Sequence, residues 1–167
     1  HLRDGETRVL AGPLERELEC IFTPGHAAGH LCFYERHTRG MIVGDMLASV
    51  GTILIDPVEG NMGQYMDSLR KIRARNASFL LPAHGFAISD PEVAIDHYLE
   101  HRLMRENRVA SALGPEAASL SSLVREVYND TPLALHGLAE RSLWSHLLKL
   151  EDEGRAENID SEWRIPR

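Results

Sequence analysis

The stretch Thr23-Pro24-Gly25-His26-Ala27-Ala28-Gly29-His30 decides how this sequence folds, together with two shorter segments, Val43-Gly44-Asp45 and Leu81-Pro82-Ala83-His84-Gly85. Each segment places a His or an Asp directly after a short apolar run that predicts a strand. Imidazole and carboxylate groups at strand ends are ligands that divalent cations accept. The three glycines that adjoin these ligands allow sharp turns. The segments therefore predict part of a metal site, with His26, Asp45 and His84 as ligands.

In the first half of the sequence, short apolar runs alternate with turns. Residues 8–10 and 17–22 predict strands joined by a turn at 11–13, and residues 31–35 and 40–43 predict a further pair. A helix is expected to begin at Asn61, because the apolar residues after it have the spacing of one helix face: Met62, Tyr65, Met66, Leu69 and Ile72. Residues 78–81 predict a buried strand. This order is typical of a layered α/β fold.

The second half begins near Asp90-Pro91, where helical periodicity replaces the strand pattern. Asp90 is the expected N-cap of a long helix that runs to about Leu113. A second helix is predicted by Leu120, Leu123, Val124 and Val127, with its cap at Ser119 or Ser121. A third is predicted by Leu138, Leu143, Leu147 and Leu150, and it is expected to stop at Gly154. Residues 155–165 predict a small hairpin, which completes the order of a winged helix-turn-helix unit.

The three His and Asp segments, in this order, resemble the second half of the metallo-beta-lactamase superfamily. The long helix with His101-Arg102 and Arg105-Glu106, and the later run 147–155, resemble the winged-helix extension of its beta-lactamase-like protein 2 branch. The resemblance implies an α/β fold: the second half of an αββα sandwich over residues 1–89, then a linker helix and winged-helix domain over residues 90–167. The superfamily's His-x-His-x-Asp-His motif is absent from the sequence. We therefore expect a C-terminal portion of a longer protein.

The resemblance also implies a function for the parent protein, that of a metal-dependent hydrolase. Two divalent metal ions, zinc first among the candidates, would activate water to attack a phosphodiester, with RNA as the expected substrate. His26 would bind one ion and His84 the other, while Asp45 would bridge both and act as the catalytic residue. The alternative substrate is a thioester or other acyl group, as in hydroxyacylglutathione hydrolases. Because zinc sites take three or four protein ligands, we expect this chain alone to bind metal weakly or not at all and to be inactive.

The winged-helix region leaves a non-enzymatic alternative open, that of a nucleic-acid-binding or dimerisation module. From Gly114 onward acidic residues outnumber the basic ones, which are Arg125, Arg141, Lys149, Arg155, Arg164 and Arg167. The formal net charge is -7, which does not favour broad attraction to polyphosphate. We therefore expect this region to pack on the catalytic domain or to form a homodimer. The expected partners are a small-molecule or RNA substrate and the missing N-terminal half of the domain.

Several further motifs have simpler interpretations. His97-Tyr98-Leu99-Glu100-His101 fits an inverted zinc-protease pattern, but a solvated or interdomain helix face is the expectation. His30 is expected to orient or pack rather than to ligate a metal. The basic run 70–75 suits the C-terminus of a helix, and contact with phosphate or RNA is the less favoured interpretation.

Cysteine content and hydropathy predict a cytoplasmic protein. Cys20 and Cys32 lie in apolar stretches, and two cysteines in a chain of 167 residues do not form a disulfide framework. Buried, reduced thiols are expected. No apolar run in the sequence approaches the roughly 20 residues needed to cross a bilayer, so no membrane partner is expected.

Overall fold

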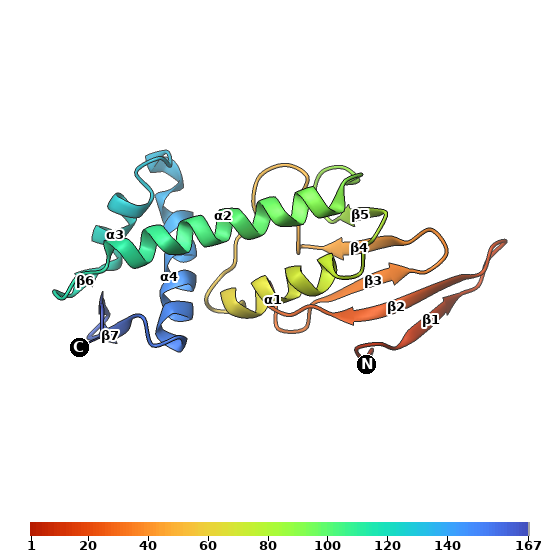
Figure 1. Ribbon diagram of the computed structural model, residues 1–167, viewed down its shortest axis with the longest axis horizontal. Coiled ribbons are helices and arrows are strands. Elements are labelled where there is room, and N and C mark those ends of the chain that lie inside the picture. The colour runs from red at the N-terminus through yellow and green to blue at the C-terminus, as the bar shows by residue number, and fades with distance from the viewer. Residues whose placement is uncertain (167) are drawn as a thin grey trace.

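The computed structural model describes residues 1–166, and its first half is a five-stranded sheet with helices packed on it (Figure 1). The strands are β1 (Thr7–Leu10), β2 (Arg16–Phe22), β3 (Leu31–Glu35), β4 (Gly40–Gly44) and β5 (Phe79–Pro82), in that spatial order. The first four pair antiparallel, and β4 pairs parallel with β5. Strands β2, β4 and β5 therefore run in the same direction, and their carboxyl ends meet at one edge of the sheet. The predicted strands are confirmed.

The two faces of this sheet differ in cover, because successive side chains of a strand point to opposite faces. One face contributes Ile21, Cys32, Met41, Val43 and Leu80 to the buried core, which α1 (Met62–Arg73) completes. The other face carries an in-register row in which Phe33 pairs with Ile42, and Ile42 with Leu81. Ile42 and Leu81 are 43% and 40% exposed. An apolar face of the sheet is thus open to solvent.

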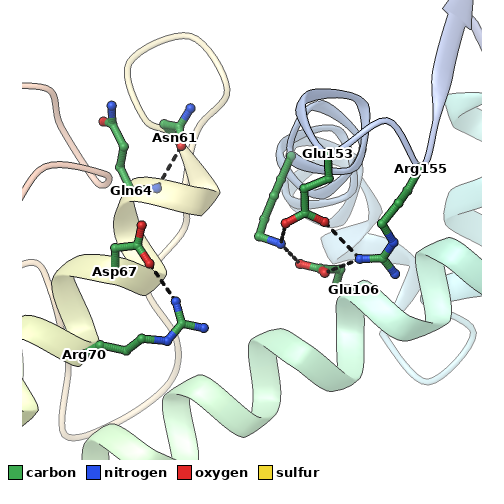
Figure 2. A network of polar contacts seen from close by, with 8 residues as sticks. Asn61, Gln64, Asp67, Arg70, Glu106, Glu153 and Arg155 are labelled. Atoms are coloured by element: carbon green, nitrogen blue, oxygen red, sulfur yellow. Dashed lines mark hydrogen bonds and ion pairs between the residues drawn. The ribbon is translucent and has the colours of Figure 1, made fainter.

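Helix α1 begins and packs as its sequence predicts. The Asn61 side chain accepts a hydrogen bond from the Gln64 amide at 2.9 Å, which caps the first turn (Figure 2). The predicted apolar stripe is buried in full: Met62, Tyr65, Met66, Leu69 and Ile72. Cys20 and Cys32 are both buried and free, as expected.

Helix α2 (Pro91–Ala112) is long and runs through both halves of the molecule (Figure 1). Asp90 caps it by accepting from the Val93 amide, which confirms the predicted start. Ile95 and Tyr98 belong to the first hydrophobic core and Val109 to the second. Because α2 contributes to both cores, the domain boundary placed between residues 89 and 90 stays a prediction. Within residues 1–166, no helix is long and apolar enough to span a bilayer.

The second half has the predicted winged-helix architecture. Helices α3 (Leu120–Val127) and α4 (His136–Asp152) pack with a small sheet of β6 (Ala118–Ser119), β8 (Glu162–Arg164) and β7 (Glu157–Ile159), in that order. Ser119 caps α3 by accepting from the Ser122 amide, which decides between the two predicted caps. A short 3-10 helix, η1 (Leu133–Leu135), was not predicted. Leu138 was wrongly assigned to the buried face of α4, since it is exposed and Ala139 is buried instead.

The winged-helix half packs on the first half through the segment 53–56, as expected. The Arg141 Nε donates to Asp56 Oδ2 at 2.6 Å, and the Ser145 hydroxyl donates to the Ile55 carbonyl at 2.5 Å. Arg102 of α2 donates to the Ile53 carbonyl. Nearby residues of one loop thus bind both α2 and α4, which fixes this loop between the two halves.

Candidate metal centre

Three loops at one edge of the sheet carry the predicted ligands. His26 follows β2, Asp45 follows β4 and His84 follows β5. Because these strands run in the same direction, their carboxyl ends deliver the three side chains to the same place. The structure therefore brings together the residues that the sequence singled out, although they are up to 58 positions apart in the chain (84 minus 26).

Asp45 lies between the two imidazoles. Its Oδ2 is 3.8 Å from His26 Nε2, and its Oδ1 is 3.3 Å from His84 Nε2. Each carboxylate oxygen thus faces a different ring. His84 is the most open of the three, with 72% of its side chain exposed. The arrangement places two nitrogen atoms and two oxygen atoms around one small volume at the surface.

The loop 53–56 fixes the orientation of His26. The His26 Nδ1 lies 3.1 Å from the Leu54 carbonyl oxygen. Because a carbonyl oxygen only accepts, Nδ1 carries the hydrogen, and Nε2 is the ring nitrogen that faces Asp45. A backbone carbonyl that holds the far nitrogen of a histidine is the support that metal-binding imidazoles commonly have. With Nδ1 held in this way, Nε2 is the nitrogen available to a cation, and it lies 3.8 Å from Asp45 Oδ2.

Asp45 is incompletely satisfied in a way that fits a metal ligand. Its Oδ1 is buried and accepts no hydrogen bond within the part of the chain that the structure describes. A buried carboxylate oxygen without a donor is costly, and a divalent cation would satisfy it. His26, Asp45 and His84 therefore fit a divalent metal ion as ligands. Among residues 1–166, however, no three His, Cys, Asp or Glu side chains form a complete cluster that could hold a metal ion.

Glycine shapes the turns that carry the three candidate ligands. Gly25, Gly44 and Gly85 all have positive φ values, at 132°, 52° and 91°. A Cβ at Gly25 would lie 2.2 Å from the Tyr65 amide nitrogen. The loop that carries His26 therefore packs this closely against the first turn of α1 only because residue 25 is glycine. A Cβ at Gly44 would lie 2.7 Å from His30 Nε2. Close packing of this kind is the reason that the sequence motif needs glycine beside its ligands.

His30 has the supporting role that was expected for it. Its Nδ1 shares a hydrogen bond of 2.9 Å with the Thr23 hydroxyl, and its other nitrogen packs against Gly44. Burial lowers the pKa of His30, and the nearby His26 lowers it further. The His30 ring thus joins the start of the loop that carries His26, through Thr23, to Gly44 beside Asp45. The same Thr23 hydroxyl contacts the Cys32 thiol, whose pKa burial raises to about 11.

The other histidine and lysine-arginine motifs lie elsewhere. His97 is exposed, whereas His101 is half-buried beside Thr52, Arg102 and Arg105. The basic run at the end of α1 is neutralised by separate ion pairs: Arg70 with Asp67, Lys71 with Asp4, Arg73 with Asp96, and Arg75 with Glu19. Acidic partners contact these side chains, which agrees with the simpler interpretation of a basic helix C-terminus, and contact with phosphate or RNA stays the less favoured interpretation.

Two groups that support this region were not predicted from the sequence, the Leu54 carbonyl and Arg102. The Leu54 carbonyl gave no signal, because a backbone group in an aperiodic loop is invisible to residue patterns. Arg102 did give a sequence signal, because it lies on the buried stripe of α2. The residues of that stripe recur at helical spacing: Ile95, Tyr98, Arg102, Glu106 and Val109. Two charged residues on the buried stripe of a helix indicate buried polar contacts.

Comparisons with known proteins agree with this geometry. Residues 4–84 match the family model of the metallo-beta-lactamase superfamily, and residues 119–163 match that of the beta-lactamase associated winged helix domain. A beta-lactamase-like protein 2 homolog of Caenorhabditis elegans is 32% identical and shares an alignment that covers 84% of this chain and 47% of the relative. The Drosophila melanogaster homolog is 28% identical, with 87% of this chain and 50% of the relative covered. The chain thus spans about half the length of these relatives.

Solved structures show the same fold. The crystal structure of a metallo-beta-lactamase family protein from Thermus thermophilus superposes with a TM-score of 0.83 at 21% identity, over 99% of this chain and 54% of that chain. A beta-lactamase domain protein from Burkholderia ambifaria gives a TM-score of 0.84 at 19% identity, over 99% of this chain and 52% of that chain. Both superpositions extend through the winged-helix half as well as the sheet.

Proposed function

The chain belongs to the metallo-beta-lactamase superfamily, with a beta-lactamase-associated winged helix domain, and from this premise we propose that it supplies half of the metal site of a hydrolase. The proposed reaction is hydrolysis of a phosphodiester, with RNA as the first candidate substrate. In this proposal the chain contributes His26, Asp45 and His84, and residues outside it complete the ligand set. Zinc is the first candidate metal.

One observation carries the proposal: Asp45 faces two imidazole nitrogens, at 3.3 and 3.8 Å, with an oxygen that accepts no hydrogen bond within residues 1–166. If Asp45 only stabilised the fold, its buried Oδ1 would be expected to accept from an Arg, a Lys or backbone amides. Within residues 1–166, neither an Arg nor a Lys forms an ion pair with Asp45. A divalent cation between Asp45 and the two imidazoles would supply positive charge and satisfy the free oxygen.

The residues of the chain have separate roles in the proposed reaction. Bound divalent cations would supply a water molecule whose pKa is low enough to act as a nucleophile at neutral pH. Asp45 has two oxygens that face different rings, so it can hold both ions and keep them close. His26 is fixed by the Leu54 carbonyl, which keeps its free nitrogen directed at Asp45. His84 lies on the open side, where a substrate would approach.

The remaining ligands would come from the rest of the protein. Zinc sites take three or four protein ligands, and this chain offers His26 and Asp45 to one ion and Asp45 and His84 to the other. The row of Phe33, Ile42 and Leu81, in which Ile42 and Leu81 are exposed and Phe33 is half-buried, is an apolar sheet face of the kind that a second sheet covers. The curated relatives are about twice as long as the chain. We infer that the missing half packs on this face and brings its ligands to the same edge.

A second candidate substrate is an acyl group such as a thioester. Phe86 is strongly exposed two residues after His84, and its amide is held by the Ser49 hydroxyl at 2.7 Å. An exposed aromatic ring, on backbone that is held two residues from His84, suits an apolar acyl chain better than a phosphodiester. This observation keeps acyl hydrolysis as the alternative.

A purely nucleic-acid-binding role has less support. In the winged-helix half Arg141, Lys149, Arg155 and Arg164 all form ion pairs with carboxylates of the same chain. Phosphate contacts require Lys and Arg that are free to neutralise phosphates. Arg167 lies outside the described residues. Packing on the first half is the role that these contacts favour.

The test uses the full-length protein, purified with zinc and then assayed on a single-stranded RNA oligonucleotide and on a glutathione thioester. Asp45→Asn keeps the size of the side chain and removes its charge, while Asp67→Asn on exposed α1 serves as the matched control. Turnover of RNA that Asp45→Asn abolishes and Asp67→Asn preserves supports the proposal. Turnover of the thioester alone would favour the alternative, and RNA cleavage that survives Asp45→Asn would contradict both.

A further inference from the structure

A cavity of about 280 Å³ lies between the two halves of the molecule, separate from the Asp45 cluster. Its walls come from the loop at Thr52, from α2 and from the winged-helix half. The polar side chains that line it are Thr52, His101, Arg102, Arg105, Thr131 and Ser142. Figure 1 shows α2 crossing α4 in the region where these elements meet. The cavity is large enough for a small organic or inorganic ion.

Arg102 gives this cavity its chemistry. The residue is only 3% exposed, and one guanidinium nitrogen donates to the Ile53 carbonyl. The guanidinium also lies over the Tyr65 ring, 5.3 Å from its centroid. Its Nε is buried and has no hydrogen-bond partner within residues 1–166. In the described residues the partners of the guanidinium are the Ile53 carbonyl and Tyr65, and neither is a carboxylate. A buried, unpaired cation is costly unless an anion joins it.

Neighbouring charges do not compensate Arg102. Arg105 points to Asp130 at 2.8 Å, and Arg108 contacts the other oxygen of the same carboxylate at 2.7 Å. Asp130 therefore serves two arginines and is fully used by them. His101 adds no negative charge, and burial together with Arg102 and Arg105 lowers its pKa. The cavity thus has an excess of positive charge.

The cavity wall also contains hydroxyl groups, which can donate hydrogen bonds to an anion. Tyr128 donates its hydroxyl hydrogen to Ser142 Oγ at 3.2 Å. The Ser142 hydrogen is therefore free to point elsewhere. An anion near Arg102 would meet a charged N–H from α2 and a hydroxyl from α4. Charge-assisted hydrogen bonds of this kind are the strong ones in proteins.

We propose that this interdomain cavity, called here the Arg102 pocket, is a binding site for an anionic group, either a phosphate or a carboxylate. Arg102 is its charge partner, and Ser142 supplies a second donor. The proposal goes beyond the hydrolase activity, because it concerns residues outside the Asp45 cluster and requires no metal ion. The pocket nevertheless shares a wall with the metal centre, since Ile53 accepts from Arg102 and the next residue, Leu54, holds His26.

The test is anion-dependent thermal unfolding of the 167-residue chain in the presence of EDTA. Inorganic phosphate and acetate are titrated separately, against sodium chloride at equal ionic strength. The expected result is a saturable rise in the unfolding midpoint with phosphate or acetate and none with chloride. The anion that saturates at the lower concentration identifies the chemical class. Equal effects of all three salts would overturn the proposal.

Three variants locate the site. Arg102→Gln should raise the half-saturating anion concentration by at least about tenfold, the loss of one charged hydrogen bond. Because Arg102→Gln alone could disturb folding, Ser142→Asp places a carboxylate in the pocket itself and should abolish the anion response while raising the unfolding midpoint in chloride. Arg125→Gln, which removes an exposed cation of α3 outside the lining of the pocket, should leave the response unchanged. A wild-type response in Ser142→Asp would contradict the proposal. The outcome is independent of the hydrolase proposal, since no metal or substrate is present.

Discussion

Two clusters of charged side chains in this molecule are built from similar groups but are satisfied to different degrees. Around Glu106, α2 and the end of α4 form a closed network: Lys149 lies 2.8 Å from one Glu106 oxygen, and Arg155 lies 3.0 Å from the other (Figure 2). Glu153 contacts both cations, so two acids balance two bases. Around Asp45, a single acid faces His26 and His84, which are neutral when they present free nitrogens.

The difference separates structural charge from functional charge. Glu106 Oε2 lacks ideal hydrogen-bond geometry, yet a permanent cation lies beside it. Asp45 Oδ1 lacks both a donor and a cation within residues 1–166. Stable proteins compensate buried charges wherever they can, and the exceptions gather at functional sites. The cluster that is left open is therefore the one to test for metal and activity, and the closed one is the one to test for stability.

The largest expected effect would sharpen this contrast at Asp45. In the full-length protein, Asp45→Ala should lower kcat by about 10⁴-fold, the scale of losing a principal catalytic group. In the 167-residue chain the same change should alter the free energy of unfolding by less than about 0.5 kcal/mol, because no partner is lost. Steady-state kinetics and urea unfolding measure the two effects. Retained turnover, or a large loss of stability, would make Asp45 a structural residue.

The reverse pattern is expected at Glu106, which is 4% exposed. Glu106→Gln leaves Lys149 and Arg155 without their central carboxylate and should destabilise the chain by about 3 kcal/mol, as for a broken buried ion pair. The more exposed Glu153→Gln should cost less than about 1 kcal/mol. Urea unfolding of both variants is the measurement. Equal costs would mean that the network does not depend on its buried member.

A pH titration tests a third buried group, His146, which lies close to the same network. Burial lowers the pKa of His146 to about 3, and Arg102 and Lys149 contribute to this lowering. Because the unfolded state binds the proton more readily, the stability is complete above pH 6.5 and falls as the pH drops toward 3. His30 and His101, whose pKa values are also lowered, contribute in the same direction.

Replacing His146 isolates its share of this pH dependence. His146→Gln should flatten the curve between pH 6.5 and about 4.5, the range above the ordinary titration of carboxylates. Urea unfolding at several pH values measures the slope for the variant and the wild-type chain. An unchanged slope would show that the other histidines carry the effect.

The smallest effect belongs to an exposed pair that serves as a baseline for both clusters. Asp67 accepts from Arg70 on the surface of α1 at 2.7 Å (Figure 2). Asp67→Asn should cost no more than about 0.5 kcal/mol in urea unfolding, and the loss should shrink further in high salt. A cost near that of Glu106→Gln would remove the distinction between buried and exposed pairs.

Much of the fold follows from local sequence. The apolar spacing of α1, the Asp90 cap and the strand ends that carry His26, Asp45 and His84 are all confirmed, because each depends on a few neighbouring residues. Convergence of the three candidate ligands was implied by the family resemblance, and it occurs because β2, β4 and β5 run in the same direction. Gly25 and Gly44 correctly indicated sharp turns beside His26 and Asp45, because both have positive φ values.

The rest depends on contacts that sequence patterns do not contain. The loop 53–56 has no periodicity, so neither its support of His26 nor its position against α4 could be predicted. Leu138 was misplaced because the apolar stripe of α4 is shared with Ala139, a small residue that carries a weak signal. Strand β6 has two residues and exists only through its pairing with β8. These features are set by tertiary packing rather than by propensity.

The most direct test of the account is the metal content of the 167-residue chain beside that of the full-length protein, by elemental analysis after dialysis against zinc-free buffer. We expect about two zinc or iron ions per full-length chain and less than about a tenth of an ion per 167-residue chain, because two ligands for each ion do not hold it tightly. Asp45→Ala should remove metal from the full-length protein. Stoichiometric metal in the 167-residue chain, or metal that survives Asp45→Ala, would contradict the assignment of His26, Asp45 and His84.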